Sequence, residues 1–131
     1  LQSLPVTGVV VVFTPQELAA MVVRKALQMC RDMKIPIIGV VENMSYLVLP
    51  ESGKRLEVFG KSRAEDMAKA AGAPLLAQVP IDPELARLCD DGDLELYNSP
   101  LITDMGREFV KAASERGRKD PKPLMPGTKG K

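Results

Sequence analysis

The sequence predicts an α/β fold of three layers, in which helices cover both faces of a parallel sheet and a β-hairpin is inserted after the second strand. Three short, largely apolar runs, at positions 8–13, 35–46 and 74–79, alternate with segments of helical periodicity, and the middle run is rich in β-branched residues. The middle run is apolar on both faces, as is typical of strands in a covered parallel sheet. The 131 residues, 45% of them hydrophobic, are enough for one domain with a core.

Polar residues stand at the carboxyl end of each run. Thr14 and Gln16 follow the first run and Asn43 ends the second. Asp82 follows the third. Because parallel sheets bind ligands beyond the carboxyl ends of their strands, we expect a ligand site here. Thr14 and Asp82 also fit helix N-caps. The chain after Asn43 returns to a strand pattern, so its amide is either an ordinary turn residue or a group that recognises a ligand.

The first helix is expected to reach about residue 34. Thr14 fits its N-cap, Pro15 its first helical position, and Glu17 closes a capping box. The predicted buried stripe consists of Leu18, Val22, Ala26, Met29 and Met33. Residues 46–59 place two strand-like segments around a turn-rich one, which predicts a hairpin.

Three further helices are expected after the hairpin. The first begins at Ser62, with Glu65 completing a capping box, and ends at Gly72. The next opens at Asp82, with Leu85, Leu88 and Cys89 facing inward. Ser99 caps the last, which runs to about residue 115. Its predicted buried face consists of Ile102, Met105, Phe109 and Ala113.

The chain divides into one predicted domain, residues 1–116, and a tail, residues 117–131. Pro, Gly and Lys dominate the tail without any apolar period, so we expect it to be basic and disordered. Within the domain, Gly60-Lys61-Ser62 resembles the end of a phosphate-binding loop. The glycine that such a loop needs five positions earlier is Arg55, and we therefore interpret the segment as an ordinary turn before a helix.

Composition excludes several function classes. The chain has 18 basic and 17 acidic residues and only 4% aromatic residues, so we expect neither nucleic-acid nor membrane partners. It contains no histidine, which excludes histidine metal sites and serine-type triads. Cys30 and Cys89 lie far apart and fit helix cores. With no signal-peptide pattern or long apolar span, we expect a reducing, cytoplasmic location.

Four motifs together carry a resemblance to a known family. They are residues 10–16 (VVVFTPQ), 39–46 (GVVENMSY), 58–60 (VFG) and 79–83 (VPIDP). In order and spacing they resemble the C-terminal half of the Mrp family of P-loop ATPases. These are iron–sulfur cluster carriers related to the nitrogenase iron protein and to the septum-site and partition ATPases. The resemblance covers residues 1 to about 115.

The resemblance implies a partial P-loop NTPase-like fold that binds ATP with Mg²⁺ and forms a homo-oligomer, commonly a dimer. In the family an asparagine at a strand end recognises adenine, and Asn43 matches it. The loop that contains Pro80, Ile81 and Asp82 corresponds to the segment on the other side of the base. Thr14 and Gln16 correspond to a loop close to the nucleotide or the partner subunit. An amide offers a donor and an acceptor that suit the adenine edge.

The sequence departs from the family pattern in two ways. The phosphate-binding loop and switch segments of the family lie upstream of where this chain begins, so we expect no catalytic residue in it. The family hairpin commonly carries Cys-Pro-x-Cys, which holds a cluster between two subunits. Here Leu49 and Ser52 stand at the two cysteine positions. Leucine cannot ligate iron and serine is a poor substitute for thiolate, so we expect no iron–sulfur cluster and no other metal ligand.

Three functions are compatible with these observations. The favoured one is the ATP base-binding and dimerisation half of an Mrp-like ATPase in iron–sulfur cluster assembly or transfer, with iron–sulfur client proteins as partners. The second is a free-standing interaction module that keeps the fold without ATPase or cluster chemistry. The third is an unrelated α/β enzyme of flavodoxin-like shape. The length of the natural reading frame distinguishes the first two.

Overall fold

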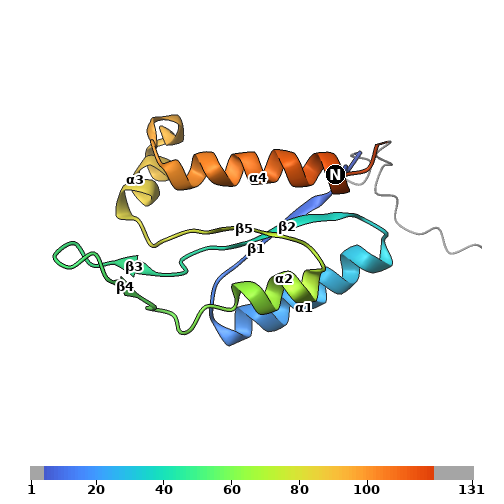
Figure 1. Cartoon of the computed structure of the whole chain (residues 1–131), viewed down its shortest axis with the longest axis horizontal. Helices are drawn as coiled ribbons and strands as arrows, with labels where there is room; N and C mark the ends of the chain where they lie inside the picture. The colour runs from blue at the N-terminus through green and yellow to red at the C-terminus, as the bar shows by residue number, and fades with distance from the viewer. Residues whose placement is uncertain (1–4, 120–131) are drawn as a thin grey trace, which may run out of the picture.

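The computed structural model describes residues 5–119, which form an α/β fold (Figure 1). In chain order the elements are β1 (Val9–Phe13), α1 (Glu17–Asp32), β2 (Ile37–Glu42), β3 (Leu47–Val48), β4 (Arg55–Leu56), α2 (Ala64–Ala71), β5 (Leu75–Gln78), α3 (Pro83–Asp91), the short 3-10 helix η1 (Leu94–Leu96) and α4 (Pro100–Arg116). The predicted strands are all present, and the four predicted helices occur in the predicted order.

The three main strands form a parallel sheet in the order β1-β2-β5. All six residues of the central strand β2 are buried, as expected for a strand covered on both faces. The register brings Phe13 opposite Glu42, and Glu42 opposite Gln78. The carboxyl ends of the three strands are therefore level with one another.

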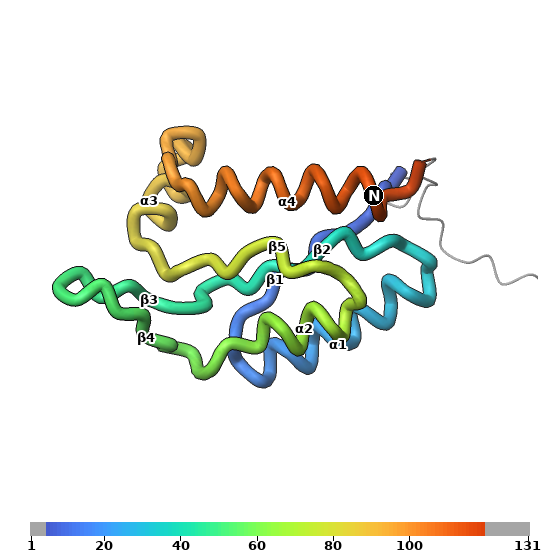
Figure 2. Tube along the Cα trace, viewed as in Figure 1, coloured from blue at the N-terminus to red at the C-terminus, as the bar shows by residue number. Residues whose placement is uncertain are grey.

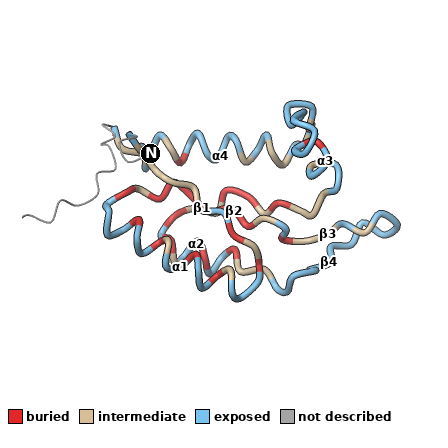
Figure 3. The backbone as a smooth tube through the Cα atoms, turned by 180° about the vertical axis from the view of Figure 1, so that it is seen from behind, coloured by how far each residue is buried: buried red, intermediate tan, exposed pale blue. Residues whose placement is uncertain are grey.

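Helices cover both faces of this sheet, which makes three layers. The traces place α1 and α2 together on one face and α4 on the other (Figures 1 and 2). One core cluster joins Leu27 of α1 and Met67 of α2 to Val40 of the sheet. A second joins Ile38 and Leu76 of the sheet to residues of α4. Figure 3 shows that buried segments concentrate along the strands and along the inward sides of α1 and α2.

The predicted β-hairpin extends away from the sheet at its carboxyl end (Figure 1). Its strands β3 and β4 pair antiparallel, Leu47 with Leu56 and Val48 with Arg55. The guanidinium of Arg55 lies 4.2 Å from the centre of the Tyr46 ring, a cation–π contact at the base of the hairpin. The second strand is shorter than predicted, because residues 57–59 are not part of it.

The predicted buried stripe of α1 is wrong. Leu18 is 74% exposed, Val22 62% and Met29 58%. The residues that face the core are instead Ala20, Val23, Leu27 and Cys30. Both sets follow the 3.6-residue period, since residues 18–23 are apolar without interruption. Periodicity alone therefore did not determine which of the two sides is buried.

The predicted cap of α1 is wrong as well. The helix begins at Glu17 with Gln16 at the N-cap position, and no side chain caps it. The hydroxyl of Thr14 donates instead to Oε1 of Gln16 at 2.6 Å. Likewise α2 begins at Ala64 without a side-chain cap, so Ser62 and Glu65 do not form the predicted capping box. Its end is as predicted, with Gly72 in the left-handed conformation at φ 62°.

The later helices also differ in part from prediction. Asp82 caps α3 as expected, but Cys89 is exposed and only Leu88 of that helix is buried. Ser99 is at the N-cap position of α4 but makes no side-chain cap bond. In α4, Phe109 is 42% exposed. Ala112 is buried there, and the half-buried residues packed against the second cluster are Leu101, Met105 and Ala113.

Most of the predicted tail, residues 117–131, lies outside the described residues. The part that is described follows α4 back to the start of β1, where the backbone N–H of Arg118 donates to the carbonyl of Thr7 at 2.8 Å. Between residues 5 and 119, no helix has the length and apolar content that crossing a membrane requires.

Candidate functional site

The chain emerging from β2 and the chain emerging from β5 are tied together at the carboxyl end of the sheet. The N–H of Ser45 donates to the carbonyl of Val79 at 2.9 Å, and the N–H of Ile81 donates to the carbonyl of Tyr46 at 2.7 Å. On the other side, the N–H of Asn43 donates to the carbonyl of Phe13 at 2.7 Å. Asn43 is thus fixed between the ends of β1 and β5.

A cavity of about 300 Å³ opens at this point. Its lining consists of Asn43, Met44, Pro80, Ile81, Asp82, Pro83, Leu85, Ala86 and Cys89. The size lies at the lower end of the range for ligand pockets, roughly 300 to 1,000 Å³. The walls are mostly apolar, with few polar groups, which is the usual composition of a small-molecule site. Four of the six predicted site residues are therefore brought together here.

The Asn43 side chain has one atom engaged within its own turn. Its Oδ1 accepts from the N–H of Met44 at 2.9 Å. Met44 follows at φ 54°, a left-handed conformation that is uncommon for a residue other than glycine. The sequence is compatible with two roles for this amide, a turn residue or a ligand-binding group. The carbonyl has the turn role, and the Nδ2 group supplies the two N–H donors that this side chain can offer a ligand.

Asp82 has both carboxylate oxygens engaged. Oδ1 accepts from the N–H of Glu84 at 2.9 Å, which caps α3, and Oδ2 accepts from the hydroxyl of Tyr97 at 2.6 Å. The Tyr97 hydrogen bond is the main reason that the pKa of Asp82 lies below its usual value, and the same bond raises the pKa of Tyr97. Asp82 therefore shapes the cavity by fixing α3 and the segment after it.

Thr14 and Gln16 lie at a different hollow. They line an apolar surface depression of about 710 Å³ together with Val12, Leu18 and Val22. The exposed side of α1 forms one wall of this depression. The structure thus separates these two predicted site residues from the cavity at Asn43.

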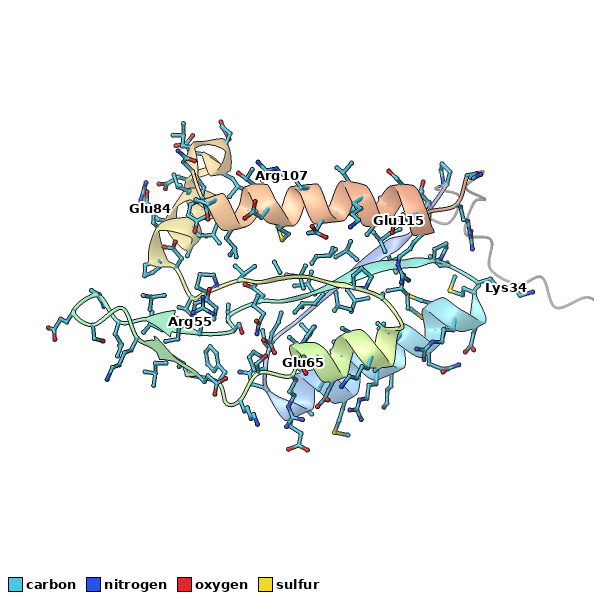
Figure 4. All side chains as sticks on the ribbon, in the orientation of Figure 1. Lys34, Arg55, Glu65, Glu84, Arg107 and Glu115 are labelled. Carbon is cyan, nitrogen blue, oxygen red and sulfur yellow. The ribbon has the colours of Figure 1, made fainter. Side chains whose placement is uncertain are left out.

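The ribbon with side chains shows which charged residues flank each end of the molecule (Figure 4). Arg55 of the hairpin and Glu84 of α3 lie at the end where the cavity opens, whereas Lys34 and Glu115 lie at the opposite end. Glu84 is engaged with Arg87, in an ion pair of 2.8 Å. This contact lowers the pKa of Glu84.

The family of the chain follows from its sequence. A family model described as ParA, NUBPL iron-transfer P-loop NTPase, matches residues 1–115. The chain belongs to this family. The NUBPL-type assignment confirms the predicted relationship to the Mrp ATPases and removes the flavodoxin-like alternative.

Characterised relatives agree with the NUBPL-type assignment. An iron–sulfur cluster carrier protein of Aquifex aeolicus is 40% identical over 112 residues, which cover 86% of this chain and 30% of that protein. The cytosolic Fe-S cluster assembly factor NUBP2 of Bos taurus is 45% identical over 85 residues, 65% of this chain and 31% of that protein. The chain spans about a third of the length of these curated relatives.

A solved structure gives the same fold. The nucleotide-binding protein of Archaeoglobus fulgidus, in complex with ADP and with cobalt, superposes with a TM-score of 0.63 at 38% identity. The match covers 73% of this chain and 40% of that protein. The predicted partial P-loop NTPase-like fold is therefore confirmed.

One polar residue of this NUBPL-type chain was not predicted as part of the site. Glu42, the last residue of β2, is fully buried, with 0% of its surface exposed. It precedes Asn43 directly and accepts hydrogen bonds from three side chains and one backbone N–H. The available signal was a charged residue at the end of an otherwise apolar strand, since buried carboxylates are rare without partners.

The described part of the chain provides no cluster of three or more His, Cys, Asp or Glu residues that could hold a metal ion. Cys30 is buried and Cys89 is exposed, and both are free thiols. In the hairpin, Leu49 and Ser52 stand where the resemblance to the Mrp family predicts its two cysteines. These donor sets do not fit an iron–sulfur cluster.

Proposed function

We propose that this chain is the nucleotide-base-binding and dimer-forming part of an Mrp-like ATPase that acts in iron–sulfur cluster assembly or transfer. The carrying observation is the cavity beside Asn43, at the strand ends where parallel sheets bind ligands. Family membership and the likeness to an ADP-bound protein support the assignment.

The cavity suits a flat aromatic base. Pro80, Ile81 and Leu85 offer apolar surface against the faces of such a ring and exclude water from its edge. The Nδ2 group of Asn43 donates a hydrogen bond to a ring nitrogen of adenine. The carbonyl of Asn43 accepts one bond from Met44 and keeps a second lone pair, so the amide can offer a base both its N–H donors and an acceptor.

Only the base of ATP is assigned to this cavity. No residue between positions 5 and 119 is assigned to Mg²⁺. An iron–sulfur cluster would be cargo of the whole protein, and Leu49 and Ser52 leave this hairpin without ligands for it. Client proteins of iron–sulfur assembly are the proposed partners.

Dimerisation is proposed to use the exposed side of α1 and the adjacent strand β1. Val12 is 57% exposed, Leu18 74% and Met21 58%. An exposed apolar surface of this kind marks an interaction site. The same surface supports the second candidate, a free-standing interaction module without nucleotide chemistry. The two candidates differ in whether the cavity at Asn43 binds a base.

The test is a titration of the ¹⁵N-labelled chain with ADP and with GDP, followed by nuclear magnetic resonance. We expect ADP to shift the Asn43 side-chain amide signals and the backbone N–H signals of Ile81, Asp82 and residues 84–86. Affinity is expected to be weak, because phosphate and Mg²⁺ contacts provide most of the binding energy in such sites. Asn43→Ala should weaken ADP by roughly 1 to 3 kcal/mol, the cost of an unpaired buried polar group.

Alkylation of Cys89 provides an independent readout. This thiol is exposed and lines the cavity, so ADP should slow its reaction, while the buried Cys30 stays unreactive throughout. Equal shifts with ADP and GDP, or an Asn43→Ala variant that binds ADP like the wild type, would remove Asn43 from the base site and favour the interaction module.

A further inference from the structure

The Glu42 carboxylate gathers donors from three separate segments of the chain. Oε2 accepts from the hydroxyl of Ser45 at 2.6 Å, the hydroxyl of Ser62 at 2.7 Å and Nε2 of Gln78 at 3.0 Å. Oε1 accepts from the backbone N–H of Arg63 at 2.7 Å. Ser45 belongs to the turn after β2, Gln78 to β5, and the other two to the loop 60–63 between the hairpin and α2.

No lysine or arginine within the described range forms an ion pair with this carboxylate. Burial alone would raise the pKa of Glu42, but the bonds from Ser45, Gln78, Ser62 and the Arg63 N–H together hold it below its usual value. The group is therefore a buried negative charge solvated only by neutral donors. A buried charge is seldom retained for stability, and its better-attested use is to specify one arrangement of the groups around it.

The arrangement specified here is the turn that carries Asn43. Glu42 precedes this turn and Ser45, its hydrogen-bond partner, closes it. Between them Met44 has its unfavourable left-handed φ of 54°, a conformation that persists only where its surroundings determine it fully. The bond between Glu42 and Ser45 thus fixes the conformation in which Asn43 lines the cavity.

Glu42 and Asn43 also connect two sides of the sheet. Glu42 contacts Ser62 and Arg63, which lie beside α2, whereas Asn43 lines the cavity bordered by α3. Successive residues of a strand point to opposite faces of the sheet. The Glu42 carboxylate can therefore bind groups on the α2 side while Asn43 lines the cavity on the α3 side. The loop 60–63 begins four residues after β4, the second strand of the hairpin.

We propose that Glu42 is a positioning residue that couples the loop 60–63, and through it the hairpin, to the orientation of Asn43 in the base cavity; this inference rests on the proposed function of that cavity. Movement of the hairpin changes the position of Ser62 and Arg63 and therefore changes base affinity. By linkage, a bound base must bias the loop in return.

The experiment repeats the ADP and GDP titrations with three further variants of the chain, beside the wild type and Asn43→Ala. Ser62→Ala removes one of the four donors from a residue that does not line the base cavity. We expect it to shift the Asn43 side-chain amide signals and to reduce the preference for ADP over GDP. Glu42→Gln should reduce that preference by about tenfold, the effect of one buried hydrogen bond. Ser114→Ala, whose hydroxyl bonds only within α4, is the matched control and should change neither quantity.

A purely structural role of Glu42 gives a different result. Ser62→Ala would then lower the melting temperature and leave both the Asn43 amide signals and the ratio of affinities unchanged, which overturns the coupling. If Glu42→Gln fails to fold, the Ser62→Ala result decides alone. If the wild type prefers ADP to GDP, and Asn43→Ala abolishes this preference while Ser62→Ala does not, the base site is supported and the coupling is rejected. If the wild type binds ADP and GDP equally, both the base site and the coupling are rejected.

Discussion

Gly39 shows how closely neighbouring strands of the sheet pack at a single position. It lies in the centre of β2, and a Cβ atom added there would lie 2.5 Å from Cγ of Leu76 and 2.8 Å from both of its methyl groups. Leu76 is buried between the sheet and α4 and cannot move aside freely. Gly39→Ala should therefore lower the free energy of unfolding by about 1 to 3 kcal/mol, the usual cost of overpacking a core. Urea-induced unfolding measures this change.

Gly106 provides the control for that experiment. It lies within α4, and a Cβ added there meets no atom within 4 Å. Gly106→Ala should raise stability by up to about 1 kcal/mol through helix propensity. The two glycine-to-alanine changes are thus expected to have opposite signs. A Gly39→Ala chain as stable as the wild type would show that the Leu76 side chain moves aside more easily than its packing indicates.

The predictability of individual site residues depended on how near their partners are in the sequence. The cap of Asp82 lies two residues away and was predicted from the Asp-Pro-Glu pattern. Its second partner, Tyr97, is 15 residues away and was not predicted. The role of Glu42 depends on donors 20 and 36 residues away, which strand periodicity does not indicate. The apolar run before Asn43 predicted its place at the strand end. It did not predict that the Asn43 carbonyl accepts a hydrogen bond from the N–H of Met44.

At the scale of elements, the hydrogen bond from Tyr97 to Asp82 holds η1 and α3 against the end of β5. Tyr97→Phe removes this bond and should lower stability near neutral pH by about 1 to 2 kcal/mol. Because the pKa of Asp82 is lowered in the folded chain, the bond contributes stability above the usual Asp value of 3.8 and loses it as the pH falls through the folded value.

The corresponding measurement is thermal unfolding of the wild type and Tyr97→Phe from pH 7 down to pH 3. The difference in melting temperature should be greatest near neutral pH and should shrink on acidification. Tyr46→Phe is the control, since the cation–π contact of Arg55 uses the face of the Tyr46 ring. A difference that is constant over the whole range would show that Asp82 does not accept this bond as a carboxylate.

The helices show why the local sequence pattern predicted that a helix forms more reliably than it predicted which side of the helix is buried. The apolar content of α1 allowed two faces, and tertiary contacts with Val40 and Met67 selected Ala20, Val23 and Leu27. The glycine end of α2 was predicted correctly because a left-handed residue is a local requirement. The predicted Ser62 cap was wrong because Arg63 takes the N-cap position. The Ser62 hydroxyl is held by Glu42 of a distant strand at 2.7 Å and accepts only a longer bond of 3.3 Å from the N–H of Ala64. Competition from long-range partners is thus the common cause of these errors.

At the scale of the whole molecule, the sheet has an uncovered edge. Within the described residues β1 pairs with β2 on one side only, and its sequence consists of four valines and a phenylalanine. Val12 at this edge is 57% exposed and borders the apolar side of α1. Edges of this kind, uncharged and strongly β-prone, favour pairing with another chain.

We therefore expect this chain to form a dimer or larger assembly through β1 and α1. Val12→Lys places a charge on the edge and should shift the assembly toward monomer, because burial of an unpaired ammonium in an interface is unfavourable. Val110→Lys is the matched control, since Val110 is 63% exposed on α4, away from that edge. Sedimentation velocity over a range of concentrations measures all three chains. A wild type that stays monomeric, or an assembly that responds equally to both lysines, would show that the β1 edge is not the contact.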